Sequence, residues 1–107
     1  MYQFGDVLII NFPFSHGRAS KRRPAIVIKD TNDNDILIAK VTSQYYETEF
    51  DVPVIDWQNA ILLSPSVIRV HKIQTVHSSL IFGQIGRLTN RDLKEVKHVF
   101  ANLLLNL

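Results

Sequence analysis

The amino-acid sequence predicts a small, mainly β domain that ends in one α-helix. Two patterns carry this prediction: the apolar runs are short and bounded by breakers such as Gly, Pro, Asn and Asp, and the spacing of apolar residues becomes helical after Thr89. The length of 107 residues is that of one domain. We therefore expect residues 1–107 to form a single domain, in which a strongly bent antiparallel sheet or small barrel carries the helix.

The expected strands are short and rich in β-branched and aliphatic residues. In chain order they are 7–12, 25–28, 36–42, 52–55, 60–63, 66–73 and 81–88. Pro13 closes the first strand, and a dense turn signal at 31–35 separates the second from the third. Pro53 favours an edge position for the fourth, because proline donates no ladder hydrogen bond. Two glycines loosen the last strand.

The final helix is expected to run from about residue 90 to near the C-terminus. The apolar residues that recur there at helical spacing are Leu93, Val96, Phe100, Leu103, Leu104 and Leu107. Thr89 and Asp92 match a variant of the capping box that starts a helix. The basic residues on or near the opposite face are Arg91, Lys94 and Lys97. The leucines at 103–105 fit either a dimer contact or a helix fully buried in the monomer.

Composition excludes several classes of protein. No apolar run exceeds four residues, whereas a membrane span needs about 20, and the first six residues do not resemble a signal peptide. The absence of Cys excludes disulfides and thiolate zinc sites, so the reducing cytoplasm is the expected compartment. The four His lack metal-ligand spacing, and no glycine-rich loop leads into a helix. Neither a metal site nor a nucleotide-dependent enzyme is therefore expected.

The net charge of +2 hides an uneven distribution along the chain. Residues 15–29 hold five bases and no acid, residues 30–56 hold seven of the ten acids, and residues 57–107 hold six bases and two acids. If the first and last thirds meet in space, they form a basic surface suited to a polyanion. A solvated loop and a solvated helix face would give the same pattern.

The densest basic cluster is Lys21-Arg22-Arg23-Pro24, where a polar loop is expected to enter the second strand. Pro24 pushes Arg23 toward extended backbone, which would aim the guanidinium at a phosphate that it can grip through two parallel N–H bonds. Basic gatekeepers beside an aggregation-prone strand share this pattern. Residues 42–46 combine two hydroxyls, an amide and two tyrosines, which fits contacts to RNA or an ordinary strand end.

Several motifs follow one another along nearly the whole chain. They are Gly5-Asp6-Val7, Asn11-Phe12-Pro13-Phe14-Ser15, Lys21-Arg22-Arg23-Pro24-Ala25-Ile26-Val27-Ile28, Val41-Thr42, Ser66-Val67-Ile68-Arg69 with Lys72-Ile73-Gln74-Thr75, and Ile85-Gly86-Arg87-Leu88. In this order they resemble the MazF/PemK (Kid-like) toxins of bacterial toxin–antitoxin pairs. The resemblance implies an SH3-like barrel with a C-terminal helix, which is the CcdB/Kid/MazF plasmid maintenance toxin fold, and a homodimer.

The same resemblance implies an mRNA interferase, a ribosome-independent endoribonuclease that cuts single-stranded mRNA at a short sequence without cofactor or metal. It also implies an acidic antitoxin as partner, through which any DNA would be contacted only indirectly. The catalytic roles fall on Arg23, before the proline of the basic motif, and on Thr42, with Ser43 as the alternative register. The residues expected along the RNA groove are Phe14, Arg18, Lys21, Arg22, Ser43, Gln44 and Arg69.

Two departures from the family pattern affect details rather than these catalytic positions. The loop at 15–20 lacks the acid that many members carry, which would alter RNA grip or sequence choice. His77 stands where Asp is common, which would alter hydrogen bonding at the strand end. His16 fits either a general acid or base, since histidine titrates near neutrality, or a solvated loop residue.

Two rival functions share some of these features. A toxin resembling the gyrase poison CcdB would have the same fold and no nuclease activity, but the Lys21-Arg22-Arg23-Pro24 motif belongs to the RNase branch. A non-catalytic SH3-like module would bind nucleic acid or a peptide. Such a module would show salt-sensitive RNA binding with no product and would be unaffected by Thr42→Ala.

Overall fold

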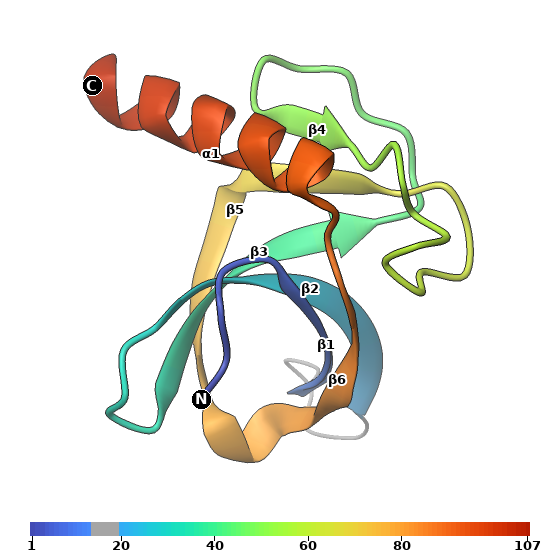
Figure 1. Ribbon diagram of the computed structural model, residues 1–107. Coiled ribbons are helices and arrows are strands. Elements are labelled where there is room, and N and C mark those ends of the chain that lie inside the picture. The colour runs from blue at the N-terminus through green and yellow to red at the C-terminus, as the bar shows by residue number, and fades with distance from the viewer. Residues whose placement is uncertain (14–19) are drawn as a thin grey trace.

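The computed structural model describes residues 1–13 and 20–107, which form one antiparallel sheet and a C-terminal helix (Figure 1). The elements are β1 (Asp6–Pro13), β2 (Ser20–Asp30), β3 (Asp35–Thr42), β4 (Asp51–Pro53), β5 (Val67–His77), the 3₁₀ turn η1 (Ser78–Leu80), β6 (Ile81–Arg87) and α1 (Asn90–Leu105). The strand order is β4-β5-β3-β2-β1-β6. Figure 1 shows the sheet curling strongly, with α1 across one end. The predicted mainly β, barrel-like fold with a terminal helix is confirmed, although β4 and β6 do not pair to close it.

Strand β2 starts earlier than predicted, so the basic cluster lies inside the sheet rather than in the loop before it. Ser20 pairs with Pro13 of β1, and this ladder continues without interruption to Ile26. The ladder between β2 and β3 begins only at Ala25. Pro24 therefore lies where β2 has one neighbouring strand, which is a position that tolerates a residue without an N–H group.

The segment 60–63 is a turn, and its prediction as a strand was wrong. The backbone N–H groups of Ala60 and Leu62 donate to the carbonyls of Asp56 and Trp57, at 3.1 and 3.0 Å. Ile61 adopts a positive φ of 64°, which lies outside the extended region. Buried and exposed side chains alternate in this segment because Ala60 and Leu62 are buried beneath the turn while Ile61 and Leu63 are exposed. The alternation does not come from a pleated strand.

The two faces of the sheet carry two separate hydrophobic clusters, as strand alternation requires. One cluster includes Val7, Ile26 and Val96 and packs beneath α1, and the other includes Leu8, Ala25 and Ile38 on the opposite face. The turn between β2 and β3 uses asparagines in left-handed backbone, with φ of 59° at Asn32 and 69° at Asn34, as turns allow.

Helix α1 starts where predicted, but its N-terminus is not a capping box. Thr89 makes no capping hydrogen bond; its hydroxyl donates to Asp56 Oδ2 at 2.6 Å. Asp92 instead accepts hydrogen bonds from the backbone of Ile55 and Asp56. The C-terminal end of α1 is not fully buried in the monomer, since Leu105 is 82% exposed. Within the described part of the chain, no helix is long and apolar enough to cross a membrane.

Candidate functional site

Two neighbouring hollows open beside the basic cluster of β2, and Arg23 lines both. The basic hollow has a volume of about 370 Å³ and is lined by Phe12, Lys21, Arg23, Ile38, Lys40, Lys72, Ile73 and Gln74. The hydroxyl hollow has a volume of about 550 Å³ and is lined by Ile9, Arg22, Arg23, Pro24, Val41, Thr42, Ser43, Ile61, Leu62, Leu63, Ser64, Ser66 and Ile85. Arg23 and Thr42, the two residues singled out by sequence, therefore border one cavity.

The sheet register explains why Arg23 and Thr42 come together. Ala25 on β2 pairs with Lys40 on β3 in an antiparallel ladder, so a continuation by two residues brings Arg23 opposite Thr42. Side chains two residues apart on a strand share one face. Both residues therefore lie on the face that carries Ala25 and Lys40, at the level where β2 and β3 cease to pair.

The hydroxyl of Thr42 is oriented by the backbone of Gln44. Thr42 Oγ1 accepts a hydrogen bond from the backbone N–H of Gln44 at 3.1 Å, which engages a lone pair and leaves the hydroxyl proton available for donation. Thr42 is half-buried, whereas Ser43 and Gln44 are exposed. Ser43 places a second hydroxyl in the same hollow.

Arg22 is held by one contact to β1 and one to β6. Its Nε donates to Asn11 Oδ1 at 3.1 Å, and its guanidinium carbon lies 3.6 Å from the centroid of the Phe82 ring. A guanidinium over an aromatic face is stabilised by cation–π attraction. These two contacts fix the guanidinium of Arg22, which also lines the hydroxyl hollow.

Arg69 lies outside both hollows and supports the edge of the sheet. Its Nε donates to Asp51 Oδ1 at 2.9 Å, and its guanidinium stacks 3.5 Å from the centroid of the Tyr46 ring. Its side chain is only 13% exposed. Burial tends to raise the pKa of Asp51, but hydrogen bonds from Arg69 and Thr48 outweigh it and hold this pKa below its ordinary value of 3.8. The pair joins β5 to β4.

Three polar residues of the basic hollow were missed by the sequence interpretation: Lys40, Lys72 and Gln74. Lys40 carried a usable signal, since it is the one base in an acidic region and stands two residues before Thr42 on a strand. Lys72 and Gln74 stand in one of the family motifs, but nothing in the sequence places Lys72 beside Arg23, because β5 is bulged beside Ala39 and residues 70–72 have no partner on β3. Of the other predicted residues, Phe14, His16 and Arg18 lie outside the described residues.

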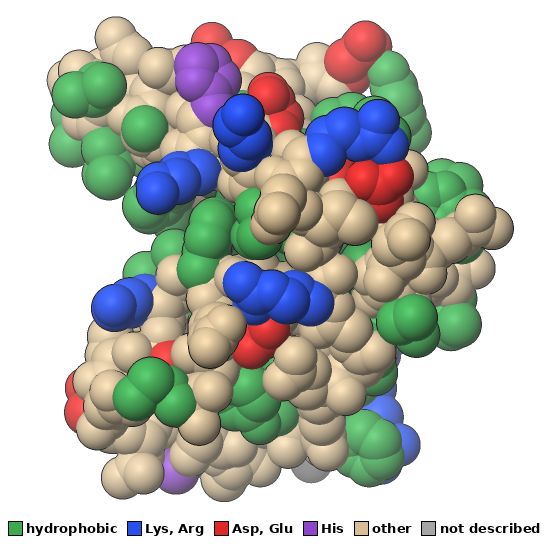
Figure 2. Space-filling view, viewed as in Figure 1, with side chains coloured by type: hydrophobic (Ala, Val, Ile, Leu, Met, Phe, Trp, Pro, Cys, Tyr) green, Lys and Arg blue, Asp and Glu red, His purple; other side chains and the backbone are tan. Residues whose placement is uncertain are grey.

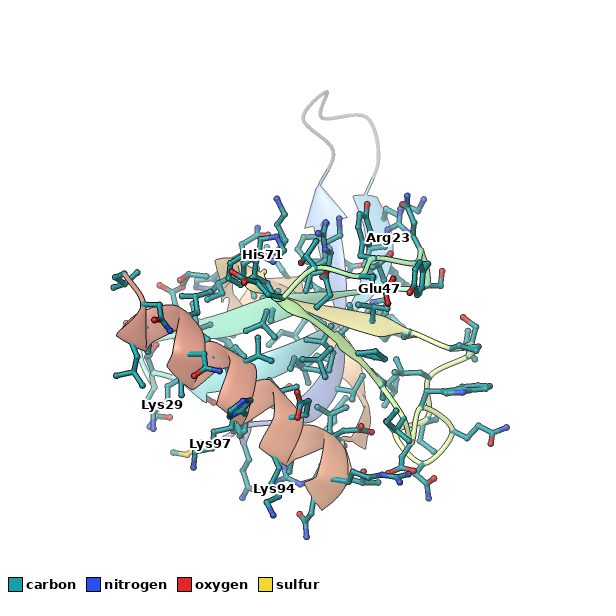
Figure 3. All side chains as sticks on the ribbon, turned by 90° about the horizontal axis from the view of Figure 1, so that it is seen from above. Arg23, Lys29, Glu47, His71, Lys94 and Lys97 are labelled. Carbon is teal, nitrogen blue, oxygen red and sulfur yellow. The ribbon has the colours of Figure 1, made fainter. Side chains whose placement is uncertain are left out.

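The two basic regions meet only in part: Lys72 joins Lys21 and Arg23 at the basic hollow, whereas the bases of α1 lie elsewhere. Figure 3 shows Arg23 at one end of the molecule and Lys94 and Lys97 of α1 at the other. On the face seen in Figure 2, Lys and Arg side chains are interspersed with Asp and Glu. Three of the bases in residues 57–107 are in ion pairs: Arg69 with Asp51 at 2.9 Å, Arg87 with Asp6 at 2.8 Å and Arg91 with Asp56 at 2.5 Å.

The described histidines lie away from the two hollows. His77 Nδ1 accepts a hydrogen bond from the backbone N–H of Ser79 at 3.1 Å and so caps η1. His71 packs against the Phe50 ring, with 5.0 Å between centroids. Burial and the nearby cations of Arg69 and Lys72 lower the pKa of His71. In residues 1–13 and 20–107, no three His, Asp or Glu side chains gather as a metal site would require.

The fold is similar to that of solved toxin structures. An endoribonuclease in complex with its cognate antitoxin, from Mycobacterial species, matches with a TM-score of 0.80 and 12% identity over 97% of this chain and 95% of that chain. The MazF of a MazE–MazF structure from Deinococcus radiodurans matches with a TM-score of 0.79 and 21% identity over 96% and 95%. The Mycobacterium tuberculosis toxin MazF-mt6 matches with a TM-score of 0.75 and 20% identity over 92% and 95%.

Because these sequence identities are low, the comparison with solved structures establishes a likeness of fold alone. No curated protein matches the sequence. The family model of the PemK-like, MazF-like toxins of type II toxin–antitoxin systems matches residues 3–104, a range that includes β1 to β6 and nearly all of α1. The chain therefore belongs to the PemK-like, MazF-like toxin family of type II toxin–antitoxin systems.

Proposed function

We propose that this toxin is an endoribonuclease, an mRNA interferase that cuts single-stranded RNA in the cytoplasm. The observation that carries the proposal is the position of Arg23 and Thr42 on adjacent strands, on one face, at the border of one cavity. This arrangement offers a fixed cation and a hydroxyl donor to a single phosphate. Among the residues of the family motifs, these two combine the chemistry that phosphodiester cleavage needs at the reacting phosphate.

The proposed reaction is an internal transfer within the RNA. The 2′-oxygen attacks the adjacent phosphorus and loses its proton to solvent, the bond from phosphorus to the 5′-oxygen breaks, and the 5′-oxygen takes a proton from solvent. The products are a 2′,3′-cyclic phosphate and a 5′-hydroxyl end. DNA lacks the attacking hydroxyl, so the mechanism itself restricts the toxin to RNA.

The two side chains act on the negative charge that grows on the non-bridging oxygens. Arg23 grips these oxygens through paired N–H groups, which a guanidinium presents in a planar fork. Thr42 donates its hydroxyl proton, which the hydrogen bond accepted from Gln44 N leaves available. A guanidinium is a poor acid, so we assign Arg23 an electrostatic role. No step of this route requires a metal.

The test is incubation of the protein with a long single-stranded RNA in excess EDTA, followed by mapping of the cut ends. We expect discrete cuts with 2′,3′-cyclic phosphate ends, lost in Arg23→Ala and in Thr42→Val. Lys29→Ala is the matched control for charge, because Lys29 is an exposed base on the same strand β2, five residues after Pro24 at the end of the basic motif. Intact RNA with the wild-type protein would refute the nuclease and favour a gyrase-type toxin or a binding module.

We further propose that a cognate acidic antitoxin neutralises the toxin. Two of the similar structures were solved with antitoxins, one as an endoribonuclease with its cognate antitoxin and one as MazE–MazF. The cations that line the basic hollow offer complementary charge, through which an acidic segment of the antitoxin would compete with RNA. The measurement is co-purification of the toxin with the product of the neighbouring gene, with loss of RNA cleavage on complex formation.

For the homodimer, we propose a contact through the C-terminal end of α1. Leu104, Leu105 and Leu107 are 52%, 82% and 95% exposed, and Figure 2 shows hydrophobic side chains gathered at this end of the helix. Contiguous exposed apolar side chains mark interaction surfaces. Light scattering after gel filtration should give a dimer for the wild type and a monomer for Leu105→Glu. If the Leu105→Glu variant were still a dimer, this assignment would be wrong and the interface would be assigned to the strand edges.

A further inference from the structure

The basic hollow contains more positive charge than the proposed cleavage step uses. Four cations line it, namely Lys21, Arg23, Lys40 and Lys72, and all four are exposed. The ion pairs among the described residues involve Arg69, Arg87 and Arg91 instead. Cations gathered around one hollow without carboxylate partners repel one another and attract an anion.

Three separate strands deliver these cations to one face of the sheet. Lys21 and Arg23 are two residues apart on β2 and so share a face. Lys40, on β3, lies opposite Ala25 of β2, and Lys72 comes from the bulged part of β5. The same hollow includes apolar Ile38, which belongs to the hydrophobic cluster on the face away from α1. The four cations therefore surround one site on the surface of the sheet. Basic side chains that merely followed one another along a single strand would not converge in this way.

We propose that the basic hollow is a phosphodiester-binding subsite for RNA, in which Lys40 and Lys72 hold a phosphate next to the one that is cut. This inference rests on the proposed function for the position of the scissile phosphate. Arg23 lines both hollows, so an RNA strand with one phosphate at Arg23 and Thr42 continues directly between the two lysines. Lysine binds phosphate as a point charge and needs no fixed geometry.

The lining of the hollow favours RNA over an acidic peptide. Phe12 and Ile73 provide apolar surface beside the cations, and Gln74 adds an amide with both donor and acceptor groups. Aromatic side chains stack on unpaired bases without strong sequence preference. A nucleotide uses all three features, since it has a phosphate, an apolar base face and polar base edges, whereas a run of carboxylates uses only the charge.

The test is a binding measurement on RNA that cannot be cut. The probe is a fluorescent, fully 2′-O-methylated single-stranded RNA, which lacks the attacking hydroxyl, and the variant is Lys40→Gln/Lys72→Gln. Lys94→Gln/Lys97→Gln is the matched control, because it removes the same charge from exposed positions on α1, far from Arg23 in Figure 3. Thermal unfolding confirms that both variants are folded.

We expect the hollow variant to bind more weakly and to flatten the plot of log affinity against log salt concentration. Loss of the contact to this one phosphate should reduce the slope by about 0.7, the value per neutralised phosphate for a single strand, whereas the control should keep the wild-type slope. Equal effects in both variants, or no effect in either, would overturn the proposal. Unchanged RNA binding with lost binding of an oligoglutamate peptide would also overturn it and assign the hollow to an acidic peptide. Because the probe is never cleaved, the result is independent of whether the protein proves to be a nuclease.

Discussion

Replacement of Asp92 by Ala should strongly destabilise the fold, because Asp92 is a buried acceptor of two backbone hydrogen bonds. Asp92 is 1% exposed, and its two carboxylate oxygens accept the backbone N–H groups of Ile55 at 3.0 Å and Asp56 at 2.9 Å. These bonds attach the first turn of α1 to the segment after β4. The variant removes both acceptors and leaves two part-buried donors without partners.

The magnitude follows from these two bonds. An unsatisfied buried donor costs about 1–3 kcal/mol, so we expect Asp92→Ala to lower the free energy of unfolding by about 3–4 kcal/mol. For a domain of this size about 1 kcal/mol corresponds to about 4–8 °C in Tm, which gives a decrease of at least about 12 °C. Asp92→Asn keeps one acceptor oxygen and should lose roughly half as much.

The assay is urea unfolding followed by far-UV circular dichroism, with Glu95→Ala as control. Glu95 is exposed on the same helix, so its removal should change stability by less than about 0.5 kcal/mol. A loss below about 1 kcal/mol in Asp92→Ala would refute the reasoning, because it would mean that water or another group satisfies both donors at no cost.

Three further predictions concern stability and titration. Gly86→Ala should cost at least about 1–3 kcal/mol by thermal unfolding, since a Cβ there would lie 2.2 Å from the carbonyl oxygen of Ala60, whereas Gly83→Ala, with no atom within 4 Å, should be nearly neutral; equal losses would contradict this. The pKa of Asp51 is lowered in the folded state, so its contribution to stability is present above its ordinary pKa of 3.8 and is lost as the pH falls through the lower folded value; Asp51→Asn should weaken the decline in stability below about pH 4. Since burial and the nearby cations of Arg69 and Lys72 lower the pKa of His71 below its ordinary 6.5, NMR titration should place its midpoint below 6.5, and a midpoint at or above 6.5 would show this assignment to be wrong.

The type and order of most elements could be predicted because they depend on local pattern. Alternating or continuous apolar runs between breakers predicted β1, β2, β3, β5 and β6, and the change of period at Thr89 predicted α1. The turn at 60–63 shows the limit of that reasoning, since a short apolar run has no period that separates a strand from a buried turn. There the backbone hydrogen bonds of Ala60 and Leu62, rather than their side chains, decide the conformation.

The candidate site depended on a different kind of information. Arg23 and Thr42 were assigned by family resemblance, and the register of β2 and β3 then accounts for their proximity. Sequence placed Arg69 in the RNA groove, but in the fold its guanidinium is paired with Asp51. The capping role expected of Asp92 was replaced by bonds to residues 36 and 37 positions away.

By itself, the sequence determined the mainly β class, the terminal helix and the basic motif on β2, because each arises from residues close together in the chain. Only the tertiary structure decided that Lys40 and Lys72 share a hollow with Arg23 and that Arg69 does not. The physical reason is that contacts across a sheet depend on ladder register and on bulges. A shift of one residue moves a side chain to the other face, and the bulge in β5 that carries Lys72 leaves no local mark in the sequence.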